Sequence, residues 1–178
     1  MDPRLAGLMQ IVTRAPWWVW LILAVLLVLG LRRRRTRIMS LARFAALPAV
    51  FLVWGLISLA LAASIQPEVA AAWALTAVIG AGAGWLVTPS GIRGDQQRRR
   101  IEVPGSTWPL AASMTVFVLK YAVAIALAIR PDARPSIAIL DMAVSGASAG
   151  FFAASWVRGL MLYRRGPHTP LEDDVVAA

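Results

Sequence analysis

The hydrophobic pattern of this chain divides into five long apolar stretches separated by short polar segments. The stretches cover about residues 16–31, 44–63, 69–88, 109–129 and 135–157. Their apolar residues run continuously and do not repeat at helical or strand period, which indicates contact with lipid. A helix needs about 20 apolar residues to cross a hydrocarbon core of about 30 Å. The pattern therefore predicts an all-α, polytopic transmembrane helical bundle with five spans, the first of them short.

Arginine is distributed unevenly among the polar segments. Three alternate junctions are rich in it, with Arg32, Arg33, Arg34, Arg35, Arg37 and Arg43 at the first, Arg93, Arg98, Arg99 and Arg100 at the second, and Arg158, Arg164 and Arg165 at the third. The other junctions hold only Arg4, Arg14, Arg130 and Arg134. Because arginine-rich junctions stay in the cytoplasm, we predict an outer N-terminus and a cytoplasmic C-terminus.

The composition agrees with a membrane protein and excludes several kinds of site. The chain is 59% hydrophobic and 15% charged, whereas soluble domains carry about 25% charged residues. It has no cysteine, which excludes disulfides and thiolate chemistry. The single histidine, His168, lies in a polar tail. We therefore expect no metal site, no cofactor and no enzymatic activity.

The net charge of +9 belongs almost entirely to the predicted cytoplasmic side. Juxtamembrane arginines commonly contact anionic head groups, at about 1 kcal/mol each. We therefore expect lipid contact, and no nucleic acid binding, from Arg32, Arg33, Arg34, Arg35, Arg98, Arg99 and Arg100. Abundant arginine and alanine are typical of a GC-rich bacterial genome, which places the chain in a bacterial inner membrane. The Arg-Gly-Asp sequence at 93–95 is then cytoplasmic, and we interpret it as a coincidence.

The two ends of the chain differ from the apolar stretches. Residues 1–15 carry apolar side chains at helical spacing, at Leu5, Leu8, Met9 and Val12. This segment is either an amphipathic helix at the outer interface or an extension of the first span. Residues 164–178 are polar and end in acidic residues. We expect a cytoplasmic tail there, disordered at its end.

Two ionisable residues lie well inside the spans, Lys120 in the fourth and Asp141 in the fifth. A charge at this depth costs roughly 3 kcal/mol and needs a partner. The two spans form an antiparallel hairpin that places both residues in its outer half, so we expect an ion pair. Ser145, Ser148 and Ser155 share a helical face with Asp141. This polar stripe favours either a proton or solute path, or a neutralised structural pair.

Glycines at four-residue spacing mark faces where helices can approach closely. Gly80 and Gly84 lie in the third span, and Gly146 and Gly150 lie in the fifth, opposite the Asp141 stripe. Small residues at this spacing allow backbone contact between membrane helices. The glycines can pack within the bundle or against a second copy of the chain in a homo-oligomer.

Three short motifs resemble those of a family of small uncharacterised bacterial inner-membrane proteins. They are the tryptophans of PWWVW at Trp17–Trp20, the VPGS entry to the fourth span at Val103–Ser106, and Lys120–Tyr121 in LKYA. The resemblance implies the five-span topology and draws attention to Lys120. It implies no activity, because the family has no known function.

These observations favour a non-enzymatic integral membrane protein. We expect an accessory or scaffold subunit that packs with itself or with a membrane partner. The alternative is a small proton- or solute-coupled transporter that uses the pair Lys120–Asp141. Gly-rich phosphate loops and triads of nucleophile, base and acid are not evident in the sequence.

Overall fold

A computed structural model describes residues 17–32, 36–63, 67–167 and 169 of the chain. The elements, in chain order, are α2 (Trp17–Arg32), β1 (Arg37–Ser40), α3 (Leu41–Ala63), α4 (Pro67–Val87), β2 (Arg93–Asp95), β3 (Arg100–Val103), α5 (Trp108–Ile129), η1 (Pro131–Ala133) and α6 (Arg134–Arg165). The expected N-terminal amphipathic helix at 1–15 lies outside the described residues, as does most of the expected tail at 164–178.

Four of the described helices are long and apolar enough to cross a membrane. These candidate spans are Leu41–Leu61, Pro67–Val87, Trp108–Ile129 and Pro131–Arg165. Helix α2 is apolar but has only 16 residues, or about 24 Å at 1.5 Å per residue. The described chain therefore holds four full-length candidates and one shorter apolar helix, where the sequence predicts five spans.

Helix α6 continues well beyond the predicted end of the last apolar stretch at residue 157. Its 32 residues extend about 48 Å, which exceeds a hydrocarbon core of about 30 Å. The last turns carry Arg158, Arg164 and Arg165 and contact β2. The extension therefore forms a support for the strands beyond the apolar part of the bundle.

Helices α4 and α6 form the core of the bundle and run parallel to each other. A Cβ atom at Gly80 would collide with the carbonyl oxygen of Ala147, and a Cβ at Gly84 with that of Phe151. The reciprocal contacts hold on the other helix, where Gly146 faces the carbonyl of Trp73 and Gly150 faces that of Ala77. Both glycine pairs are thus used within one chain, against each other.

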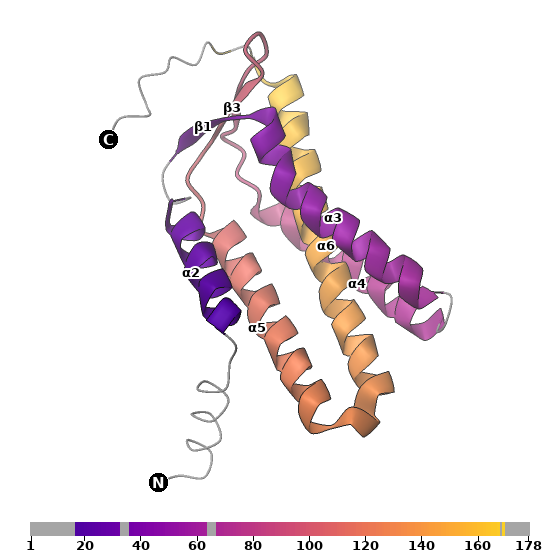
Figure 1. Ribbon diagram of the computed structural model, residues 1–178. Helices are drawn as coiled ribbons and strands as arrows, with labels where there is room; N and C mark the ends of the chain where they lie inside the picture. Colours follow the sequence, from indigo (N-terminus) through magenta and orange to yellow (C-terminus); the bar gives the residue numbers. More distant parts are fainter. Residues whose placement is uncertain (1–16, 33–35, 64–66, 168, 170–178) are drawn as a thin grey trace.

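A small antiparallel sheet, which the all-α prediction does not include, lies at one end of the mainly helical structure (Figure 1). The strand order is β1-β3-β2, with Arg37 opposite Val103 and Gly94 opposite Ile101. The sheet packs on α3 and α6 through Ile101, which is 0% exposed, and through Ile92 and Tyr163. Two of the arginine-rich polar segments therefore fold together instead of forming separate loops.

The sheet lies at the end of the bundle where the described arginine-rich segments meet. Helices α2, α4 and α6 end there, and α3 and α5 begin there (Figure 1). Arg130 and Arg134 lie at the opposite end, in the turn between α5 and α6. In Figure 1, α5 runs beside α2 and diverges from α6 toward the sheet. Among the described residues, one end of the bundle is thus basic and the other carries little net charge.

Candidate functional site

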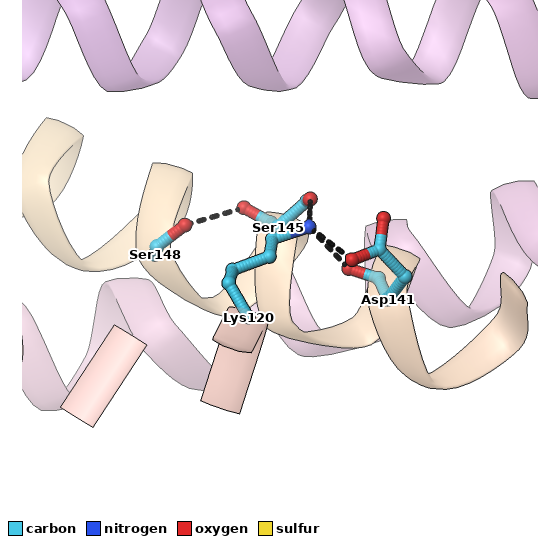
Figure 2. A network of polar contacts seen from close by, with 4 residues as sticks. All are labelled: Lys120, Asp141, Ser145 and Ser148. Carbon is cyan, nitrogen blue, oxygen red and sulfur yellow. Dashed lines mark hydrogen bonds and ion pairs between the residues drawn. The ribbon is translucent and has the colours of Figure 1, made fainter. Parts of the chain in front are cut away.

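The predicted intramembrane pair lies where α5 and α6 contact each other. The Nζ atom of Lys120 is 2.6 Å from Oδ1 of Asp141 and forms an ion pair with it. The same ammonium donates to the backbone oxygen of Asp141 at 3.0 Å and to Oγ of Ser145 at 2.7 Å (Figure 2). An ammonium has three N–H donors, so these three acceptors on α6 match its full hydrogen-bonding capacity.

The tight turn η1 brings the two charges to the same level of the hairpin. Lys120 lies about 15 Å along α5 from Arg130, and Asp141 lies about 10 Å along α6 from Arg134. The long lysine side chain spans the remaining difference in depth. The two side chains are 31% and 35% exposed, so the pair lies on the flank of the bundle. Pairing there offsets a cost of roughly 3 kcal/mol for each charge at membrane depth.

The polar stripe that the sequence predicts on α6 divides into two parts. Ser145 joins the ion pair, whereas the Oγ atom of Ser148 donates to the carbonyl of Ser145 in its own helix, at 2.9 Å. About four turns from Asp141, Ser155 donates to the carbonyl of Gly84 in α4, at 3.1 Å. The hydroxyls of Ser148 and Ser155 therefore bind backbone carbonyls of α6 and α4. The serines do not form a continuous row from Asp141.

Arg158 has a contact that the distribution of arginines along the chain does not predict, because that distribution indicates only a side of the membrane. Its guanidinium donates to the carbonyl of Trp85 and lies 5.7 Å from the centre of that indole ring. Trp85 belongs to the last turn of α4, where free carbonyls and the helix dipole favour a positive charge. Arg158 thus fastens the basic end of α6 to α4.

The arginines assigned to lipid contact lie in two regions. Residues 33–35 and the side chain of Arg32 are outside the described part of the chain. Arg98 and Arg99 are exposed in the turn between β2 and β3, and Arg100 begins β3. The turn is stabilised because the backbone N–H of Arg98 donates to Oδ1 of Asp95 at 2.9 Å.

The Arg-Gly-Asp sequence forms strand β2 and does not lie on an exposed loop tip. Asp95 is 3% exposed, and its carbonyl accepts a hydrogen bond from the hydroxyl of Tyr163 at 3.3 Å. A Cβ at Gly94 would collide with the ring of Tyr163. This segment is therefore part of the packing between the sheet and α6, in agreement with its interpretation as a coincidental match to an adhesion motif.

Comparison with known families gives a match over most of the chain. Residues 1–168 match the model of a family described as Family of unknown function (DUF6622). Neither the curated proteins nor the solved structures contain a match to the chain. The match supplies no activity, because the function of the family is unknown.

Proposed function

The chain belongs to the DUF6622 family of unknown function, as its resemblance to an uncharacterised family predicts, and we propose that it is a non-enzymatic membrane scaffold. In this proposal its helices cross the membrane and bind a membrane partner. The pair Lys120–Asp141 is a structural clip that fastens α5 to α6. The competing function is a proton- or solute-coupled transporter in which the same pair carries the coupled charge.

The observation that carries the proposal is the complete hydrogen bonding of the Lys120 ammonium by three oxygens of α6. A proton or solute path needs polar groups that continue across the membrane. The next hydroxyls along α6, those of Ser148 and Ser155, are bonded to backbone carbonyls. This arrangement supports a clip between two helices more strongly than it supports a relay.

The arrangement of charge supports an orientation for this scaffold. The described arginine-rich segments gather at the sheet end of the bundle, and positive residues remain in the cytoplasm. We therefore place the sheet on the cytoplasmic side of a bacterial inner membrane, where Arg98, Arg99 and Arg100 contact anionic head groups. The turn η1 then lies on the outer side.

The outer face of α3 is the surface that we assign to the partner. Trp54 lies near the middle of α3 and is 68% exposed. An indole N–H in hydrocarbon favours a hydrogen-bond acceptor, which lipid chains do not supply. The glycine faces of α4 and α6 are buried against each other, so a second copy or another protein binds elsewhere.

Purification in a mild detergent tests the scaffold directly. We expect the native mass to exceed that of one chain, through self-association or a co-purifying membrane protein, and we expect Trp54→Leu to reduce it. Trp17→Leu is the matched control, because Trp17 is also exposed but lies at a helix end. A monomer without any partner in the wild type contradicts the scaffold.

Proton uptake into liposomes tests the transporter alternative separately. A clip predicts that the wild type and Asp141→Asn give the same uptake as protein-free liposomes. Uptake by the wild type that Asp141→Asn abolishes, with the variant still folded, would replace the scaffold with the carrier.

A further inference from the structure

An apolar cavity of about 130 Å³ opens between the sheet and the helices at the basic end of the molecule. Its floor includes the buried residues Ile92 and Phe152, and its mouth includes Arg43 and Trp108. Trp108 is 56% exposed at the beginning of α5. The cavity thus connects buried apolar residues with the surface, at the level where the apolar helices end and the basic segments begin.

Arg37 of β1 lines this cavity. It lies on the face of the strand where apolar side chains are expected. Arg37 and Met39 share one face of β1, opposite Val103 and Ile101 of β3. Ile101 is fully buried, so this is the inward face of the sheet. Arg37 therefore lies on the packed side of the strand, whereas its neighbour Ile38 lies on the other side.

The inward guanidinium has an unsatisfied donor. Its Nη2 atom is buried and has no hydrogen-bond partner among the described residues. The Nε1 atom of Trp156, which also lines the cavity, is likewise buried without a partner. A buried donor without an acceptor is unfavourable, because it loses its hydrogen bonds to water and gains none in the protein. Two such donors beside one cavity indicate a ligand with acceptor oxygens.

The lining of the cavity defines the charge of that ligand. No acidic residue lines it, and Arg37 and Arg43 are its only charged lining residues within the described chain. Glu102 does not compensate Arg37, because its register opposite Ile38 places it on the other face of the sheet. The remaining lining is mainly aliphatic and aromatic. A suitable ligand therefore combines an anionic group with an apolar chain.

We propose that this cavity binds one anionic phospholipid, with the phosphate at Arg37 and an acyl chain along the apolar wall. The guanidinium matches phosphate oxygens in a bidentate geometry, and the indole N–H of Trp156 supplies a second donor. The mouth opens at the level of the basic segments, where phospholipid phosphates lie in a membrane. The site differs from general head-group contact by exposed arginines, because it encloses part of one lipid. It requires neither a protein partner nor a role for Lys120–Asp141.

The test is a lipid titration of the purified full-length chain in detergent micelles, followed by native mass spectrometry. The probes are dioleoyl phosphatidylglycerol and dioleoyl phosphatidylcholine, which have the same chains and different head-group charge. We expect one phosphatidylglycerol to bind about tenfold more tightly than phosphatidylcholine, equivalent to about 1.4 kcal/mol. Arg37→Gln should bring the ratio of the two affinities close to one.

Two variants complete the design. Arg93→Gln removes an exposed arginine from β2 of the same sheet and should keep the wild-type ratio. Trp156→Phe removes only the indole N–H and part of the ring, and should lower the affinity for phosphatidylglycerol several-fold. This variant provides the test if Arg37→Gln does not fold.

Three results would overturn the proposal. The first is equal affinity of the wild type for both lipids. The second is an Arg37→Gln variant that keeps the wild-type ratio of the two affinities, together with a Trp156→Phe variant that binds phosphatidylglycerol as tightly as the wild type. The third is displacement of phosphatidylglycerol by millimolar glycerol phosphate, which would identify a simple anion site without a chain.

Discussion

Replacement of Gly80 by alanine should separate the two central helices of the bundle. A Cβ at this position would overlap the carbonyl oxygen of Ala147 in α6, which is backbone and cannot rotate away. Forcing extra volume into such a contact costs about 1–3 kcal/mol. Separation of the helices also weakens the neighbouring Cα–H···O contacts, at about 0.5–1 kcal/mol each. Alanine also favours a helix over glycine by about 1 kcal/mol, so we expect a net loss of about 1–3 kcal/mol of stability.

Gly82→Ala is the matched control, because Gly82 lies in the same helix between the two packed glycines. Apart from its chain neighbours and the backbone of its own helix, no heavy atom lies within 4 Å of a Cβ placed there. Alanine favours a helix over glycine by about 1 kcal/mol, so this variant should be neutral or more stable than the wild type. The two substitutions are chemically identical and are expected to differ in sign.

Unfolding in dodecylmaltoside micelles with increasing dodecyl sulfate measures both variants. Tryptophan fluorescence follows the transition, since Trp73 and Trp85 lie in α4 itself. Equal stability of Gly80→Ala and Gly82→Ala would refute the close parallel packing of α4 on α6. A destabilised Gly82→Ala with an unaffected Gly80→Ala would mean that α4 presents its other face to the core.

Other expectations concern the sheet and the orientation. Tyr163→Phe should cost about 1 kcal/mol in the same unfolding assay, because it removes the hydroxyl that donates to the carbonyl of buried Asp95; an unchanged midpoint would contradict this bond. Ile101→Ala should lower the stability by about 2–4 kcal/mol, since Ile101 is fully buried. A smaller loss would mean that the sheet contributes little to the stability of the fold. The chain has no cysteine, so Gln97→Cys and Asp132→Cys can be labelled singly with an impermeant maleimide. Asp132→Cys should react in intact cells and Gln97→Cys only after permeabilisation; the opposite result reverses the orientation.

The helices could be predicted from the sequence because lipid-facing helices are defined by continuous apolar runs. The boundaries of α3, α4 and α5 lie within three residues of the predicted stretches. The strands could not be predicted in this way. Arg37–Ser40 and Arg93–Asp95 are short and carry charges, and their pairing with β3 depends on the helices that bring them together. Alternation of apolar residues over four positions is too short to identify such a sheet.

The ion pair could be predicted because a hairpin fixes the relative depth of two residues. The relative depth of Lys120 and Asp141 depends only on the helix rise per residue and on the short turn between α5 and α6. The contact of Ser155 with α4 could not be predicted, because a helical wheel does not show which neighbour lies beside each turn of a long helix. The inward direction of Arg37 depends on strand register, which a four-residue strand with charged residues does not reveal in its sequence.

The central claim, that Lys120–Asp141 is a clip between α5 and α6, is tested most directly by a double-mutant cycle. The variants are Lys120→Met, Asp141→Asn and the double variant, unfolded as described for Gly80→Ala. Each single change leaves one charge unpaired at membrane depth and should cost about 2–3 kcal/mol. The double variant should lose little more than either single one, which gives a coupling energy of about 2 kcal/mol. Additive effects, with a coupling energy below about 0.5 kcal/mol, would contradict the clip.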